Sequence, residues 1–193
     1  MEKYVDDVHV LAQSNSILSD ADLNSKSTDD IEIPEDGDIP QEMLDLVEAG
    51  YIVIHPDRNV SITQKYRDHV LTNPHADDLG EERVVSFVGE NTIVFSENTT
   101  SNAAGNVNKI TWHWWGYQIY LSSASVYILD GLINNSSTGL MNDYLGSYLP
   151  TALSYAVALY IFYHQVALHV ANQHRKGVIL KYIWGVPAGF RSQ

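Results

Sequence analysis

Residues 109–121 read KITWHWWGYQIYL, and this stretch decides which kind of fold the second half of the chain forms. β-Branched and aromatic residues dominate it, which favours extended structure, and Gly116 interrupts it at the centre. The pattern predicts either a pair of strands or one kinked strand. Successive side chains of a strand point to opposite faces, so the three tryptophans cannot all enter one small core. Either other parts of the chain cover both faces of this segment, or one face is exposed.

Exposed tryptophan beside tyrosine is suited to a membrane interface, to sugar stacking or to a protein partner. A further tryptophan ends the stretch VILKYIW at residues 178–184. We therefore predict that five aromatic residues contact a membrane or a protein partner: Trp112, Trp114, Trp115, Tyr117 and Trp184.

A long uncharged region separates these two aromatic stretches. From Tyr144 to His174, 31 successive residues include no Asp, Glu, Lys or Arg, and Pro150 can begin a helix that runs to about Gln173. At ~1.5 Å per residue this helix would be about 36 Å long, enough to cross a hydrocarbon layer of ~30 Å. Its final third is polar, however, and the apolar residues 149–163 have the length of a buried core helix or of a membrane-inserting hairpin arm. Both interpretations stay open at this point.

Three basic residues follow the apolar helix. Arg175 and Lys176 come directly after its predicted end, and Lys181 lies within the next predicted strand. Cations at the end of an apolar helix attract anionic headgroups, so these three are predicted to be membrane-anchoring charges.

His164, His169 and His174 lie in the polar part of the predicted helix at intervals of five residues. That interval rotates successive side chains by about 140° on a straight helix, so the three rings do not converge on one metal ion. We expect either ordinary polar helix positions or a pH-responsive group whose protonation adds positive charge beside Arg175.

Predicted strands and helices make the second half an α+β unit. The strands are residues 109–115, 117–121 and 178–184, and Ser122 can cap the first helix. The sequence predicts one small mixed sheet packed on the long apolar helix.

The first half has a different composition. Residues 1–40 are acidic, and Asp, Ser, Glu and Pro dominate their second part, which predicts a disordered leader or linker. Residues 41–95 predict a small acidic α+β region with a helix that ends at Gly50, a strand hairpin, a second helix and a second hairpin. Helix, hairpin and helix in this order resemble the end of a winged-helix domain. The alternative is a small acidic element that packs on another surface.

The balance of acidic and basic residues changes near residue 104, close to the place where the composition changes. Of the 24 acidic residues, 22 precede residue 104, whereas 5 of the 11 basic residues follow it. Residues 96–108 are rich in Ser, Thr, Asn, Ala and Gly, which predicts a flexible connector and a boundary before an aromatic-rich domain of residues 109–193. So acidic an overall balance argues against nucleic acid as a partner.

The chain has no recognisable catalytic motif. It lacks cysteine, a Gly-x-Ser-x-Gly elbow, a phosphate-binding glycine loop and a His-Glu-x-x-His helix. We therefore predict a non-enzymatic protein with no cofactor, no metal site and no small-molecule substrate. Residues 1–18 lack the basic and apolar regions of a Sec signal peptide.

The motifs of the second half are similar to those of a known family. Asn108-Lys109-Ile110 leads into WWG and IYLS, and GVI at residues 177–179 precedes KYIWGVP. This pattern resembles uncharacterised bacteriocin-like small proteins of Gram-positive bacteria. The resemblance implies an acidic leader that is removed from a glycine- and aromatic-rich part, which then acts on target membranes. The chain departs from the family in its long first half and in lacking a double-glycine export site.

These observations predict an antimicrobial, bacteriocin-like precursor. Its C-terminal half would act on anionic target membranes, and its acidic N-terminal half would keep that part soluble through complementary charge. The alternative is a soluble two-domain module that binds a protein partner. The chain is expected to be bacterial, and either secreted by a non-Sec route or cytoplasmic.

Overall fold

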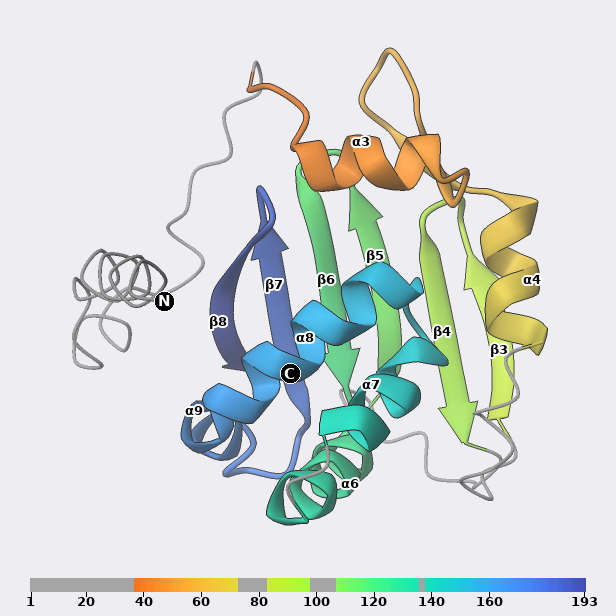
Figure 1. Cartoon of the computed structure of the whole chain (residues 1–193). Coiled ribbons are helices and arrows are strands. Elements are labelled where there is room, and N and C mark those ends of the chain that lie inside the picture. The colour runs from red at the N-terminus through yellow and green to blue at the C-terminus, as the bar shows by residue number, and fades with distance from the viewer. Residues whose placement is uncertain (1–36, 73–82, 98–106, 136–137) are drawn as a thin grey trace, which may run out of the picture. The chain divides into compact units, whose positions relative to one another are not determined.

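The computed structural model describes residues 37–72, 83–97, 107–135 and 138–193 (Figure 1). All described residues belong to the second compact unit of the chain, Glu35–Gln193. The acidic leader predicted over residues 1–40 therefore lies almost wholly outside the described residues.

A six-stranded antiparallel sheet organises the second unit, and its strands follow one another in chain order. They are β3 (Arg83–Val88), β4 (Thr92–Glu97), β5 (Asn108–His113), β6 (Gly116–Leu121), β7 (Val178–Ile183) and β8 (Val186–Ser192). The predicted α+β class is confirmed. The prediction of a mixed sheet was wrong, because every strand after β3 runs antiparallel to its predecessor, including β7, which returns beside β6 after the helical connection.

One face of the sheet carries the apolar core. Ile93, Ile110, Ile119 and Leu180 lie opposite one another across four successive strands, and none is more than 3% exposed. Residues on the alternate positions of β5 are only half-buried. This alternation is the period expected of strands that have one face on a core.

The connection between β6 and β7 supplies the helices that cover this face. They are α6 (Ser123–Asn134), α7 (Thr138–Gly146), α8 (Thr151–Tyr163) and α9 (Gln165–Ala171). α8 runs across the sheet in Figure 1, and it buries Leu153, Val157 and Ile161, which recur at helical spacing.

The single helix predicted over residues 150–173 is two helices in the structure, so this prediction was wrong. α8 ends at Tyr163 and α9 begins at Gln165, with an angle of 83° between them. His164 lies at the break, and its Nδ1 is 3.0 Å from the Tyr160 carbonyl oxygen. A side chain that interacts with this carbonyl competes with helix continuation, and the bend returns Leu168 to the core.

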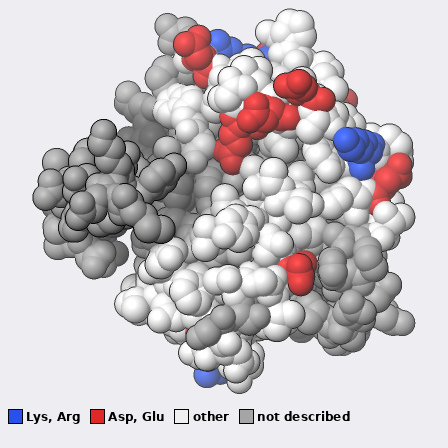
Figure 2. All heavy atoms as spheres, viewed as in Figure 1, with Lys and Arg blue, Asp and Glu red and all other residues white. Residues whose placement is uncertain are grey.

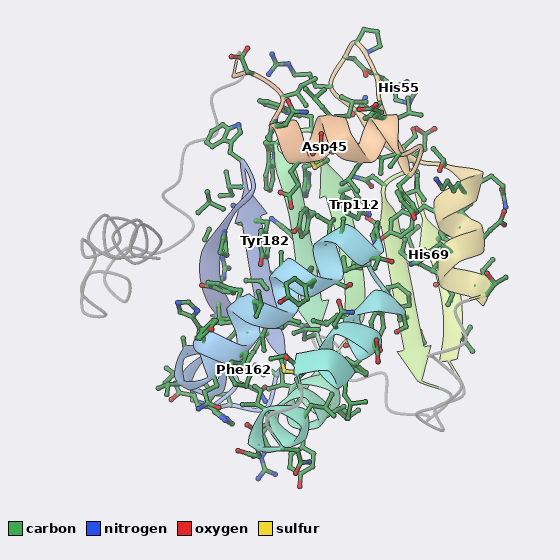
Figure 3. The ribbon with its side chains drawn as sticks, in the orientation of Figure 1. Asp45, His55, His69, Trp112, Phe162 and Tyr182 are labelled. Atoms are coloured by element: carbon green, nitrogen blue, oxygen red, sulfur yellow. The ribbon has the colours of Figure 1, made fainter. Side chains whose placement is uncertain are left out.

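The segment before the sheet packs on the same core. It consists of α3 (Gln41–Glu48), β1 (Ile52–Ile54), β2 (Val60–Ile62) and α4 (Gln64–Thr72), close to the boundaries predicted from sequence. The Tyr66 hydroxyl of α4 donates a hydrogen bond to the Tyr148 carbonyl oxygen at 2.9 Å. His69 Nε2 lies 3.1 Å from the carbonyl oxygens of Gly146 and Leu149, so it links α4 to the end of α7 and to the connection that precedes α8 (Figure 3).

The predicted domain boundary at residues 96–108 does not divide the fold. β4 pairs with β5 in the register Ile93↔Ile110, so one sheet continues from one side of this connector to the other. If the two regions were separate domains, β5 would have an unpaired edge and the apolar face of β4 would be exposed to water. The predicted regions 41–95 and 109–193 are thus parts of one compact unit.

β8 was not among the predicted strands, because Gly185, Pro187 and Gly189 are residue types that favour turns. A two-residue turn of Trp184 and Gly185 joins β7 to β8, and both residues have positive φ, at 49° and 72°. Two such residues form the tight turn whose twist matches that of the flanking strands. The antiparallel hairpin places Phe190 opposite Leu180.

Candidate functional site

Two of the five predicted contact residues lie in the core. Trp112 and Tyr117 are fully buried between the sheet and the helices, with ring centroids 5.1 Å apart. Trp112 also meets Tyr66 edge-on at 5.6 Å, and Tyr117 stacks on Tyr182 at 4.8 Å (Figure 3). Predicting these two as membrane or partner contacts was wrong for this fold, because covering helices make this face of the strand its interior face.

Trp115 lies in the turn between β5 and β6 and is packed by side chains of the opposite sheet face. His113 stacks on its ring at 4.4 Å, and Lys181 Nζ lies 5.3 Å from the ring centroid. Trp115 is 9% exposed. The predicted anchoring charge Lys181 therefore lies beside a predicted contact residue, but it is on the sheet face that α8 does not cover.

Burial of the ring, together with the positive charge of Lys181, lowers the pKa of His113 to about 4. The unfolded histidine binds a proton near pH 6.5 and the folded one does not, so His113 favours folding above pH 6.5. We expect this stability to be lost as the pH falls from 6.5 to 4, at a cost of about 2 kcal/mol after allowance for the exposed part of the ring.

Urea unfolding between pH 7 and pH 4 measures this effect. The variant His113→Gln should lose stability less steeply in that window than the unaltered chain. A parallel fall in both proteins would assign the pH dependence to other groups.

Trp114 and Trp184 lie at the tips of neighbouring hairpins and are half-buried. The Arg58 guanidinium carbon lies 4.2 Å from the Trp114 ring centroid, and the Trp184 amide donates a hydrogen bond to the Trp115 carbonyl oxygen at 2.9 Å. These two side chains keep enough exposed surface to serve as the contacts that the sequence predicted.

The outer surface of α8 and α9 is largely apolar and includes no Asp, Glu, Lys or Arg, although Thr151, Gln165 and His169 are exposed there as well. Its exposed large side chains are 54–74% exposed: Tyr155, Tyr163, Val166 and Val170. We name these four residues the outer helical face. Figure 2 shows a broad uncharged area over these helices, with acidic side chains gathered nearer α3. Sequence reasoning marked the uncharged run but did not identify which of its residues face outward.

The basic and histidine residues that were predicted to act near the membrane are distributed over different places. Arg175, Lys176 and His174 are exposed just after α9. His164 stacks on Tyr160 at 4.3 Å, and His169 Nε2 lies 2.8 Å from Asp130 Oδ1. The three histidines do not converge, and the described ranges contain no group of three side chains that could hold a metal ion.

A half-buried carboxyl group, that of Glu42, lies where α3 meets the sheet, and sequence reasoning missed it. The Tyr117 hydroxyl lies 3.3 Å from Glu42 Oε1, and Glu42 Oε2 has no hydrogen-bond partner among the described residues. Burial raises the pKa of Glu42, and Asp45 raises it further, whereas the Tyr117 bond opposes the change. A Cβ atom on Gly185 would lie only 3.2 Å from Oε2, so the turn between β7 and β8 closes over this group.

Among the described helices, none is by itself long and apolar enough to cross a membrane, although α8 and α9 pass that test as a bent pair.

The likeness to bacteriocin-like proteins depends on the motifs within residues 108–122 and 177–187 alone. Comparison with protein-family models, with curated proteins and with solved structures found no match to this chain.

Proposed function

We propose that this chain is a non-enzymatic, bacteriocin-like protein that acts on anionic membranes, and that the outer helical face makes the contact. The observation that carries this proposal is that α8 is apolar on both sides. Its inner side buries Val157 and Ile161, and its outer side exposes Tyr155 and Tyr163. A helix at the surface of a globular protein ordinarily has a polar outer side.

Charge supports the same orientation. Arg175 and Lys176 follow α9 directly, and each cation near an anionic bilayer contributes about 1 kcal/mol of attraction. Tyr155 and Tyr163 carry hydroxyl groups on apolar rings, which suits the boundary between headgroups and acyl chains. The bent pair α8 and α9 would therefore lie on the membrane surface in the folded protein.

The precursor part of the proposal rests on the packing of the first half. Tyr66 of α4 meets Trp112 of β5, and β4 covers one edge of β5. Removal of the first half would uncover this part of the core and leave an apolar, weakly basic fragment. The acidic half would thus keep the second half soluble by covering apolar surface as well as by complementary charge.

Flotation of the intact chain with vesicles of phosphatidylcholine and phosphatidylglycerol tests the contact. The double variant Val166→Asn and Val170→Asn should bind about tenfold more weakly, because two apolar side chains lose their burial in lipid. The matched control is Val84→Asn and Val88→Asn on β3, where both residues are also more than half exposed. Equal loss in both double variants, or no binding by the unaltered chain, would contradict the proposal.

The alternative, a soluble module that binds a protein partner, has one observation in its favour. Trp114 and Trp184 remain partly exposed at adjacent hairpin tips, beside the cationic side chain of Arg58. Tryptophan and arginine are enriched where proteins bind one another. A Trp184→Ala variant that leaves vesicle binding unchanged but abolishes capture of a specific protein would favour this function.

Membrane binding should strengthen from pH 7.5 to pH 5.5, because histidine gains positive charge in this range. His174 is exposed beside Arg175, whereas His164 stacks on Tyr160 and His169 pairs with Asp130, so we expect substitution of His174 to affect membrane binding most. Flotation at both pH values should show a flatter profile for His174→Gln than for His164→Gln. The same profile in both variants and in the unaltered chain would refute this role.

A further inference from the structure

A cleft of about 630 Å³ lies between α6 and the end of α9. Its volume falls in the range of about 300–1,000 Å³ that is typical of small-molecule sites. The polar and aromatic side chains that line it include Ser123, Tyr127, Asp130, His169, Gln173 and Arg175.

Polar contacts hold the two walls of this cleft in place. His169 Nε2 lies 2.8 Å from Asp130 Oδ1, which links α9 to α6. Asn172 Nδ2 donates a hydrogen bond to Ser123 Oγ at 3.3 Å, while its Oδ1 accepts one from the Gly177 amide at 3.0 Å. The Asp130 carboxylate beside Nε2 orients the imidazole ring of His169, and the second ring nitrogen, Nδ1, is on the other side of the ring.

Arg175 has a backbone conformation that its residue type disfavours. Its φ is 54°, in the left-handed region where glycine carries no steric penalty. Residues with a strained backbone concentrate at functional sites, where the role of the side chain offsets the conformational energy. A guanidinium group binds phosphate through two parallel hydrogen bonds. The side chain of Arg175 could therefore bind a phosphate group in this cleft.

The position of α6 also favours an anion. Ser123 is the first residue of α6, and the preceding Ser122 caps the helix by accepting a hydrogen bond from the Ser125 amide. The helix therefore begins at the cleft, and its positive dipole end faces the same region as Arg175.

We propose that this cleft binds an organic phosphate. Arg175 and His169 hold the phosphate group, and the exposed ring of Tyr127 covers the organic part of the ligand. The cleft contains none of the four residues of the outer helical face, although Arg175 also belongs to the charges of the proposed membrane contact. A soluble phosphate ester and a phospholipid headgroup share the chemistry that the cleft recognises.

Titration of the ¹⁵N-labelled intact chain with glycerol 3-phosphate tests the proposal. We expect saturable shifts of amide signals around His169 and Arg175, and at least tenfold weaker binding by Arg175→Gly. Because glycine prefers the backbone conformation of residue 175, this variant should unfold at a higher temperature than the unaltered chain. Loss of binding together with a gain in stability separates a ligand-binding role from a structural one.

Two control variants test whether the effect is specific. Lys176→Gln removes a neighbouring cation that does not line the cleft, and Arg58→Gly relieves a similar positive φ of 65° in the turn between β1 and β2. Both should bind glycerol 3-phosphate within twofold of the unaltered chain. Equal weakening by Arg175→Gly and Lys176→Gln, or no saturable shift with glycerol 3-phosphate, would overturn the proposal.

The source of the phosphate is decided by competition. Vesicles of phosphatidylglycerol that displace glycerol 3-phosphate from the cleft identify a lipid headgroup, whereas vesicles that leave its binding unchanged identify a soluble ester. The Val166→Asn and Val170→Asn variant should retain glycerol 3-phosphate binding even where it loses vesicle binding. Loss of glycerol 3-phosphate binding and loss of vesicle binding can therefore be observed separately, and each tests only one of the two proposals.

Discussion

Replacement of Trp112 by alanine is expected to lower the free energy of unfolding by about 3–5 kcal/mol, the range for truncating a large buried aromatic residue. Trp112 is completely buried, and its ring meets Tyr66 of α4 and Tyr117 of β6. The substitution would leave a cavity where the first half of the unit packs on the sheet. Urea denaturation followed by circular dichroism measures the change.

Trp114→Ala is the matched control, because it removes the same side chain from a half-buried position two residues further along the hairpin. The substitution should lower the free energy of unfolding by no more than about 1.5 kcal/mol, since part of the Trp114 ring is already in contact with water. Similar losses in the two variants would show that Trp112 is not the packing centre that the structure indicates.

Replacement of Gly116 by alanine is expected to cost about 3–5 kcal/mol, at the upper end of single-residue effects. A Cβ atom at this position would lie 2.2 Å from the Tyr182 carbonyl oxygen, and the glycine has a φ of 150°. The obstructing atom belongs to the backbone of β7, which is held by its pairing with β6. Relief of the clash would therefore require β6 and β7 to separate locally.

Gly131→Ala is the matched comparison, because it is expected to raise the free energy of unfolding instead of lowering it. Gly131 is exposed within α6, and a Cβ atom there would meet no atom within 4 Å. Alanine restricts the unfolded chain and favours helix, so this variant should gain about 0.5–1 kcal/mol. If the unfolding midpoints of Gly116→Ala and Gly131→Ala moved in the same direction, the proposed role of the β6–β7 contact would be contradicted.

The local elements of this fold could be predicted from sequence because their patterns are local. Alternating and aromatic residues marked β5, β6 and β7, and a glycine and a turn marked the ends of α3 and β1. β8 escaped prediction because a proline, two glycines and a polar end resemble a turn until a neighbouring strand pairs with them. The run of uncharged residues indicated an apolar helix but contained no sign of the break at His164.

The candidate sites depended more strongly on tertiary structure. Strand alternation required the tryptophans to occupy both faces, but only the packing of α4 and α8 makes the face of Trp112 the interior one. Likewise, Asp130 and His169 are 39 positions apart and form a pair only because α6 and α9 lie side by side. Composition and periodicity are properties of neighbours in the chain, and they specify which segments are apolar. Which apolar face is covered, and which polar side chains share a cleft, depends on contacts between distant segments, and these contacts are absent from any local pattern.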